Sequence, residues 1–560
     1  MHTMDAQAVV RVTTGLLQGT REEGVVVYRG VPFAQPPVGH LRFESPQPPE
    51  PWPGIRDASR PGPASYQFNA GNQGEVERIV ADIDPGVPGI MAWPAYTNAT
   101  YRHNRAAEDC LYLDIWVPES APRGGLPVYV YYHGGANAVS SGSFELERGA
   151  NLAREANMIV IRPNYRLGAL GWVHFGLVTG DLPHAVNLGV QDQFAALKWV
   201  HENIAAFGGD PDNITIGGES AGATAVSHLL THPDAHRYVR RAVLQSLSPF
   251  NLWCTQQRPE AAAVARMYLD LLRIDDPAQL RTIDPNRLLA VQNVLTRYFP
   301  PDRHLAWRPL GGVIDGNWVP QAPALHLSEN TMASSGLEVA IGFAKDEWQF
   351  FRGHSPTVRH GSRQDVLAVL EQAFGADGAE EIYQQYHALH PDHSPGLLLS
   401  DIMSFEFFKL PSLAIAQNLS TQRIPVHVFQ FSYDLPGLGG RLRAVHTGDI
   451  PFLFRNHGER DLAWWPAFDG ASREEVRRVS ARMGELYASF IRTGDPGPGW
   501  PRFDAEGWSV LDFGRLIEPK PGLLKPEWDI FRQHGFGSVR SMENVLVGNV
   551  REALAHTAAT

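Results

Sequence analysis

Short apolar runs alternate with longer amphipathic segments through the middle of the chain. Between residues 188 and 209 apolar side chains recur at helical spacing, and Gly208 and Gly209 end the predicted helix. Such an alternation of helices with short buried strands is typical of a mostly parallel sheet covered by helices, so we expect an α/β fold. The predicted strands are residues 111–117, 127–132, 158–161, 214–216, 242–244, 339–341 and 426–431.

Three kinds of segment depart from this alternation. Residues 8–31 alternate apolar and polar positions around glycines, which predicts short antiparallel strands. Residues 44–108 are rich in proline, glycine and polar residues, and we expect a long lid-like loop with a short helix near residues 75–80. Residues 255–335 and 352–420 look mainly helical and are too long for simple crossovers. We expect them to be helical insertions over the carboxyl end of the sheet.

Composition and charge narrow the classes of function. The formal net charge of −12 argues against nucleic acid and anionic membrane surfaces, because phosphate binding needs clustered Lys and Arg. The first residues lack a signal-peptide pattern, and no apolar run approaches the roughly 20 residues of a membrane span. Cys110 and Cys254 are the only cysteines, so the fold does not depend on an oxidising compartment. We therefore expect a cytoplasmic protein, with a monomer as the simplest assembly.

A glycine-flanked serine follows the predicted strand at residues 214–216. The segment Gly218-Glu-Ser-Ala-Gly222 joins this strand to a helix-like stretch, the context of a nucleophile elbow. The sharp turn holds the serine hydroxyl clear of the backbone, and the two glycines let the arms of the turn approach each other. Ser220 is therefore the candidate nucleophile. A glycine-rich loop with an incidental serine is the alternative for these five residues alone.

A serine hydroxyl needs a histidine base, and the histidine needs a carboxylate that orients it. On parallel sheets of this kind the order along the chain is serine, acid, histidine, each on a loop after a strand. The loop after residues 339–341 carries Asp346 and Glu347, and the glycine-rich segment after residues 426–431 carries His446. Position nominates His446 as the base and leaves both acids open.

Backbone donors for an oxyanion are expected after the predicted strand at residues 127–132. His133-Gly-Gly-Ala136 offers the amides of Gly134, Gly135 and Ala136, and the Ala221 amide follows the candidate nucleophile. Each such donor typically contributes about 3 kcal/mol of transition-state stabilisation. A glycine-rich turn is the alternative for this loop by itself. Several aromatic residues that follow the predicted strands would line a pocket or pack in the core: Phe250, Trp253, Phe350 and Phe351.

Nearly the whole chain resembles the type B carboxylesterases, a family that includes bacterial para-nitrobenzyl esterases and the cholinesterases. The motifs that carry the resemblance are Tyr28-Arg-Gly-Val-Pro-Phe-Ala34, Glu108-Asp-Cys-Leu-Tyr-Leu-Asp114, His133-Gly-Gly-Ala136, Asn164-Tyr-Arg-Leu-Gly168, Asn187-Leu-Gly-Val-Gln-Asp-Gln193, Phe207-Gly-Gly-Asp-Pro211, Gly217-Gly-Glu-Ser-Ala-Gly-Ala223, Lys345-Asp-Glu347 and Thr493-Gly-Asp-Pro496. The resemblance implies one α/β-hydrolase domain over residues 1–560.

The same resemblance assigns individual roles. It implies that Glu347, rather than Asp346, is the triad acid and that His446 is the base. It implies oxyanion donors at Gly135, Ala136 and Ala221, with Gly134 beside them. Glu219, next to the nucleophile, would tune His446, hold a water or stabilise the loop.

The resemblance also implies structural roles outside the triad. Glu108 and Arg166 are expected to form a buried ion pair that ties the long loop to the core. Family members from oxidising compartments often pair the cysteine of Glu-Asp-Cys with an upstream cysteine, but Ser65 occupies that region here, so we expect Cys110 to be a free buried thiol. Asn137 replaces a residue that is usually bulky, which implies a more polar pocket.

These residues predict a serine carboxylesterase that acts on a small ester through an acyl-enzyme on Ser220. No metal or organic cofactor is needed for this chemistry, and His201-Glu202 lacks the second histidine of a zinc-protease helix. Hydrolysis of amides, carbamates or thioesters by the same triad is the first alternative. A catalytically dead relative used for binding is the second.

Overall fold

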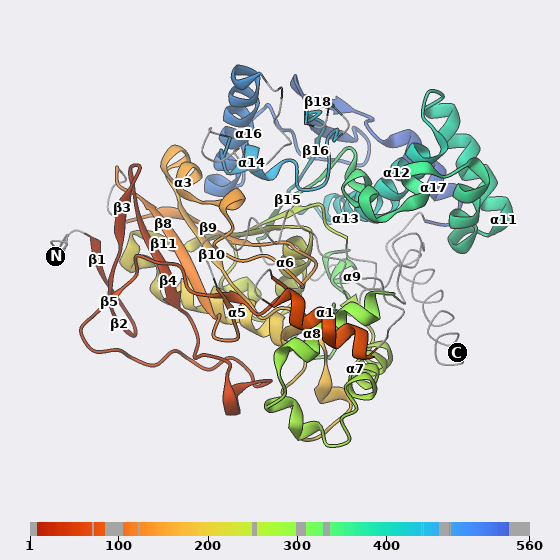
Figure 1. Cartoon of the computed structure of the whole chain (residues 1–560). Helices are drawn as coiled ribbons and strands as arrows, with labels where there is room; N and C mark the ends of the chain where they lie inside the picture. Colours follow the sequence, from red (N-terminus) through yellow and green to blue (C-terminus); the bar gives the residue numbers. More distant parts are fainter. Residues whose placement is uncertain are drawn as a thin grey trace.

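A twisted sheet runs through the middle of the structure and carries helices on both faces (Figure 1). The computed structural model describes residues 8–69, 72–83, 105–120, 124–248, 255–297, 310–328, 336–437, 439–440, 442–457, 470 and 472–536. Among these residues, no helix is both long enough and apolar enough to span a bilayer.

The strand order of this sheet is β18-β17-β16-β15-β12-β11-β9-β10-β8-β4-β3. Strands from β10 to β17 in this order are parallel to their neighbours, whereas β18 at one edge and β8, β4 and β3 at the other pair antiparallel. The carboxyl ends of parallel strands meet at one edge, so the loops after β9, β11, β15 and β16 lie near one another. The strands are β3 (Thr20–Glu22), β4 (Val25–Pro32), β8 (Tyr112–Pro118), β9 (Leu126–Tyr132), β10 (Ile159–Pro163), β11 (Gly209–Glu219), β12 (Arg241–Gln245), β15 (Glu338–Ala344), β16 (Val426–Phe431), β17 (Ser509–Phe513) and β18 (Ile517–Pro521).

Every strand predicted from an apolar run is confirmed, with shifts of a few residues at the ends. The predicted antiparallel strands in residues 8–31 are also confirmed, since β1 (Val9–Val12) pairs with β2 (Gly15–Gln18) and β3 pairs with β4. The predictions end at residue 431, whereas the structure adds β17 and β18 at the sheet edge.

Side chains of β9 alternate between two cores, one on each face of the sheet. Val128 and Val130 pack in a core with α5 (Leu188–Asn203) and α6 (Ala221–Thr231). Tyr129 and Tyr131 pack in the other core with α3 (Ala150–Ala156) and α16 (Arg473–Thr493). This period of two on a strand buried on both faces explains why its sequence is a continuous apolar run rather than an alternating one.

Helices make up most of the described residues of the two predicted insertions. In the first they are α7 (Arg258–Leu272), α8 (Pro285–Arg297) and α9 (Pro323–Ser328). In the second they are α10 (Pro356–His360), α11 (Arg363–Leu389), α12 (Pro395–Ser404), the π-helical turn η9 (Phe405–Lys409) and α13 (Leu410–Thr421). In the long loop the predicted short helix is confirmed as α1 (Gln73–Ile83), and residues 84–104 lie outside the described part.

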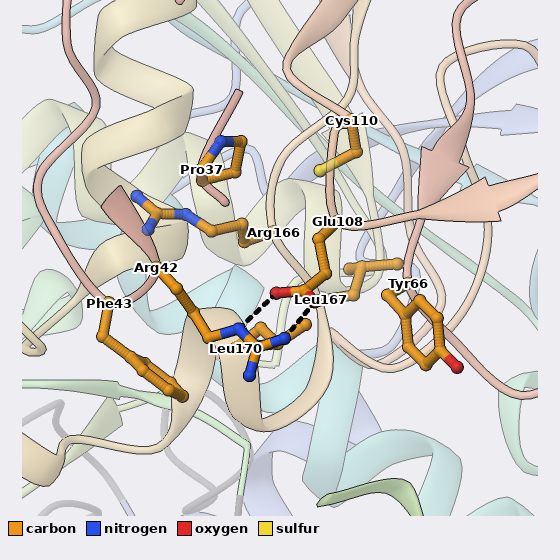
Figure 2. Close-up of a pocket in the computed structure, with 9 residues that line it drawn as sticks. All are labelled: Pro37, Arg42, Phe43, Tyr66, Glu108, Cys110, Arg166, Leu167 and Leu170. Atoms are coloured by element: carbon orange, nitrogen blue, oxygen red, sulfur yellow. Dashed lines mark hydrogen bonds and ion pairs between the residues drawn. The ribbon is translucent and has the colours of Figure 1, made fainter. Parts of the chain in front are cut away.

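The expected ion pair between Glu108 and Arg166 is wrong, because each residue has a different partner. Glu108 binds Arg42 through both carboxylate oxygens, and Arg42 also donates to the Ile283 carbonyl oxygen at 2.6 Å. Arg166 instead binds Asp192 on α5, with 2.7 Å from Nη2 to Oδ1. Figure 2 shows Glu108 turned toward Arg42, with Arg166 close by. Arg42 and Arg166 line the same pocket, and their positions relative to the predicted strands could not show which of them binds Glu108.

Replacing the two members of the observed pair should give strongly non-additive losses of stability. We expect Arg42→Met and Glu108→Gln to show a coupling of about 1–3 kcal/mol in a double-mutant cycle measured by urea unfolding, because the groups share a bidentate, largely buried contact. The matched cycle of Glu108→Gln with Arg166→Met should be nearly additive. Coupling confined to that second cycle would restore the original assignment.

Cys110 is a buried free thiol, as expected. Burial raises the pKa of Cys110 to about 12, and a hydrogen bond with Ser65 only partly offsets this effect. Ser65 therefore lies beside Cys110, in the region where the family resemblance places a second cysteine. Because the thiolate is the reactive form, a thiol held protonated in this way is chemically inert at neutral pH.

Candidate active site

The turn between β11 and α6 holds Ser220 in a strained backbone conformation. Its φ of 57° and ψ of −123° lie outside the regions that most residues adopt. The Ser220 N–H donates to the Gln245 carbonyl oxygen on the neighbouring strand at 3.0 Å, which helps to hold the turn. At Gly222 a Cβ atom would lie 2.0 Å from the Tyr132 carbonyl oxygen, so no larger residue fits there. These features are those of the predicted elbow.

The loop after β9 lies directly against this serine. A Cβ placed on Gly134 would be 3.3 Å from the Ser220 Cβ, so the predicted oxyanion loop lies next to the candidate nucleophile. Gly135, Ala136 and Asn137 all have positive φ, at 104°, 54° and 57°. Three successive left-handed residues turn the chain sharply beside Ser220. Their amides and that of Ala221 are the candidate donors for an oxyanion.

Asn137 is buried, and its side-chain amide donates to the Leu310 carbonyl oxygen at 2.8 Å. The expectation that Asn137 makes the pocket more polar stays a prediction. Its side-chain amide thus ties the loop after β9 to Leu310, two residues before β14 (Gly312–Val313) in the first insertion, which is a structural use of the same polar group.

Glu347 and His446 form a hydrogen-bonded pair after two neighbouring parallel strands. His446 Nδ1 donates to Glu347 Oε2, and both side chains are almost completely buried. The other oxygen of Glu347 accepts from the Ser246 hydroxyl and from the Ala344 N–H, each at 2.7 Å. All of these contacts present hydrogen to the carboxylate, so Glu347 is fixed as an acceptor. That arrangement leaves Nε2 of His446 as the nitrogen that can accept a proton.

The Nε2 atom of His446 faces the elbow. It lies 3.0 Å from Oε1 of Glu219, the residue that directly precedes Ser220, although the geometry is not that of a hydrogen bond. Burial raises the pKa of Glu219 well above its usual value, whereas the charge of His446 acts in the opposite direction and favours the ionised carboxylate. Burial by itself would lower the pKa of His446, but the Glu219 and Glu347 carboxylates outweigh it and raise that pKa to about 9. The site thus stabilises an imidazolium, the form that His446 takes when it accepts a proton.

Changing Glu219 to Gln should shift the pH dependence of hydrolysis toward acid. A general base must be unprotonated in the free enzyme, so kcat/KM rises as His446 loses its proton. Removal of the Glu219 charge lowers the His446 pKa, and the acid limb of kcat/KM is expected to move to lower pH. The matched control is Glu338→Gln, which removes a carboxylate paired with Arg241. Identical profiles for the two variants would contradict the role of the Glu219 charge.

Aromatic rings surround the imidazole of His446. The ring centroids of Phe350, Phe351 and Phe408 lie 5.5, 5.5 and 5.0 Å from that of His446. Phe408 comes from the π-helical turn η9 in the second insertion, a contact that no sequence pattern indicated. Phe250 and Trp253, the other two aromatic candidates, lie outside the described residues. The rings exclude water from one side of His446, which strengthens its interactions with the carboxylates.

Two polar residues at the end of β12 connect the candidate groups and were not predicted. Gln245 accepts the Ser220 N–H with its backbone, and its side chain donates to Asp449 at 2.6 Å. Ser246 donates to Glu347. β12 lies between β11 and β15, so the residues at its carboxyl end are neighbours of the loops that carry Ser220 and Glu347. The predicted strand order could therefore have identified these two polar residues. In the described part of the chain, no group of His, Cys, Asp and Glu side chains could hold a metal ion.

Comparison with known proteins identifies the family of this chain. The family model described as "Carboxylesterase family" matches residues 6–521. A phenmedipham hydrolase of Pseudarthrobacter oxydans is 33% identical over 520 residues, which cover 91% of this chain and 96% of the relative. A para-nitrobenzyl esterase of Bacillus subtilis is 30% identical over 538 residues, covering 92% and 96% of the two chains.

Solved structures give the same assignment. A Geobacillus stearothermophilus carboxylesterase superposes with a TM-score of 0.78 at 31% identity, over 93% of this chain and 99% of the other. A structure titled PNB esterase gives a TM-score of 0.75 at 28% identity, over 94% and 99%. The fold is thus that of the α/β-hydrolases. With a family model that matches most of its length and relatives aligned along nearly all of theirs, this chain is a carboxylic ester hydrolase and belongs to the carboxylesterase family.

Proposed function

We propose that Ser220, His446 and Glu347 form the catalytic triad and that hydrolysis proceeds through an acyl-enzyme on Ser220. One observation carries the proposal: His446 lies between Glu347 on its Nδ1 side and the strained elbow on its Nε2 side. This arrangement supports the proposal, because it gathers a candidate nucleophile, a candidate base and a candidate orienting acid from three loops at one edge of the sheet.

The geometry supports the following sequence of steps. Ser220 Oγ attacks the ester carbonyl carbon while His446 Nε2 takes the hydroxyl proton. The oxyanion that forms is held by the amides of Gly135, Ala136 and Ala221. His446 then protonates the leaving alcohol, and the acyl group stays on Ser220. Water, deprotonated by His446, then attacks the acyl carbon, and His446 gives this proton to Ser220 Oγ as the acid is released.

We propose small, largely apolar esters as substrates. Three phenylalanine rings lie against His446, and an apolar wall beside the base suits an apolar acyl or alcohol group. Relatives named for para-nitrobenzyl esters and fumonisin B1 at 30% and 29% identity are compatible with organic esters of varied shape. Amides, carbamates and thioesters remain the alternative, because the same triad would attack their carbonyl groups.

A para-nitrophenyl ester series from acetate to palmitate tests the proposal. We expect turnover with a clear optimum at short acyl chains, together with an organophosphate adduct that mass spectrometry locates on Ser220. An adduct on another serine would overturn the assignment of the nucleophile. A matched ester and amide pair decides the alternative, since faster amide cleavage would contradict the proposed substrate class.

A further inference from the structure

Asp346, the residue before Glu347, binds the loop that carries His446. Its Oδ2 atom accepts the Ala444 N–H at 3.2 Å, and its own N–H donates to the Ala444 carbonyl oxygen at 2.9 Å. Arg443 donates to Oδ1 at 3.2 Å. Only 2% of Asp346 is exposed, so these bonds form away from water. The two adjacent acids therefore contact two successive parts of one loop.

These contacts set the distance between the proposed acid and the proposed base. Ala444 lies two residues before His446, and Asp346 is directly bonded to Glu347 along the chain. Asp346 and Val445 also form an isolated parallel bridge between the two segments. Any movement of the 443–445 segment would have to break bonds to Asp346 before it could displace the imidazole from Glu347.

The second insertion holds the same turn from the other side. Lys409, the last residue of η9, donates from Nζ to the Lys345 carbonyl oxygen at 2.6 Å. Ser404, directly before η9, accepts the Trp348 N–H at 2.8 Å. These two bonds fall on either side of Asp346 and Glu347. A π-helical turn is rare and is frequent at functional sites, because its extra residue redirects side chains that a regular helix would point elsewhere.

Charge links Lys409 to Asp346 inside the protein. Lys409 is 6% exposed. Among the nearby carboxylates, Asp346 contributes most to stabilising its ammonium charge. Burial lowers the pKa of Lys409, and the Asp346 carboxylate opposes this change. Burial also raises the pKa of Asp346, and the charges of Lys345, Arg443 and Lys409, in that order, oppose it. A buried cation without a carboxylate nearby would carry a large desolvation penalty.

We propose that Asp346 and Lys409 are positioning residues of the esterase, which lock the Lys345–Trp348 turn against the His446 loop and so hold the imidazole in register with Glu347. This inference rests on the roles proposed for Glu347 and His446. The proposal gives neither residue a contact with the substrate. Each acts through the backbone of a segment that carries a triad member.

The test measures kcat, KM and Tm for Asp346→Asn, Asp346→Ala, Lys409→Met and the double variant Asp346→Asn with Lys409→Met. We expect Asp346→Ala to lower kcat about 100-fold, with KM nearly unchanged, because a small displacement of a catalytic group slows the chemical step rather than binding. Asp346→Asn should lower kcat about tenfold, since its amide oxygen can still accept the Ala444 N–H.

The double variant separates positioning from simple charge pairing. The double variant should lose less Tm than the sum of the two single changes, because it removes both members of one pair of opposite charges, while kcat stays low. The matched control is Asp512→Asn with Lys520→Met, a largely buried carboxylate paired with a lysine on β17 and β18. Both single variants and the double variant of this control should keep kcat within about twofold of the wild-type value, because mutations at distant sites usually act independently.

Recovery of kcat together with Tm in the double variant would overturn the inference, as would unchanged kcat in both Asp346 variants. Ser220→Ala, measured beside them, keeps the two proposals distinguishable. An inactive Ser220→Ala with fully active Asp346 variants would refute positioning and leave the triad standing. An active Ser220→Ala would instead refute the proposed function itself.

Discussion

Replacement of Ser220 by alanine is expected to lower kcat for para-nitrophenyl esters by about 10⁶-fold, to the small residual rate that an oxyanion site and binding provide without a nucleophile. No acyl-enzyme can form in this variant, because alanine has no atom in place of Oγ. The amides of Gly135, Ala136 and Ala221 would remain, so substrate binding should change little. KM is therefore expected to stay within a few-fold of the wild-type value.

Initial rates and a pre-steady-state burst check this result. The wild-type protein should release one equivalent of para-nitrophenol per active site in the burst, and the variant should release none. Ser227→Ala is the matched control, since Ser227 is buried on α6 and donates only to the Thr224 carbonyl oxygen. Full activity of Ser220→Ala would place the chemistry on another residue.

The second large effect is expected for Glu347→Gln, which should lower kcat about 10⁴-fold with little change in the fold. Glutamine has one amide oxygen and one NH₂ group. Two hydrogens, from Ser246 and Ala344, already point at Oε1, so the amide oxygen must face them. The NH₂ group then faces Nδ1 of His446 and favours the tautomer that carries its hydrogen on Nε2. That tautomer cannot take a proton from Ser220.

Activity at saturating substrate and thermal unfolding measure this prediction. Glu260→Gln is the control, because Glu260 is also buried and accepts the Gln257 N–H at 2.7 Å, a bond that an amide oxygen can keep. We expect the control to retain kcat. A Glu347→Gln variant within tenfold of wild type would contradict the proposed tautomer control and reopen the choice between the two acids.

That choice shows what the pattern of residues could and could not predict. Strand order and the carboxyl-end rule predicted from the sequence alone that Ser220, the two acids and His446 lie close together, because the loops that follow parallel strands meet at one edge of the sheet. Position alone left Asp346 and Glu347 equivalent. The structure separates them: Glu347 contacts the imidazole, whereas Asp346 contacts the backbone two residues earlier.

Interactions between distant segments were harder to predict. The prediction that Arg166 binds Glu108 was wrong. The partner of Glu108 depends on how the loop that carries Arg42 packs, and the residues near Glu108 in the sequence do not determine that packing. Lys409 had no signal at all, since a lysine in a helical segment is normally a solvated one. Lys409 is buried at the end of a π-helical turn, and the spacing of residues along the chain does not predict a change from α-helix to π-helix.

The π-helical turn also bears on how this enzyme could be redesigned. At first sight, exchange of residues 352–420 for the corresponding segment of another hydrolase changes only the insertion, and with it the selectivity for substrates. Yet Ser404 and Lys409 are bonded to the turn around Glu347, and Phe408 packs on His446. A graft that omits these positions would alter the catalytic rate together with selectivity. An exchange of the insertion should therefore leave Ser404–Lys409 unchanged. Recombination libraries should keep those residues as they are in the parent protein.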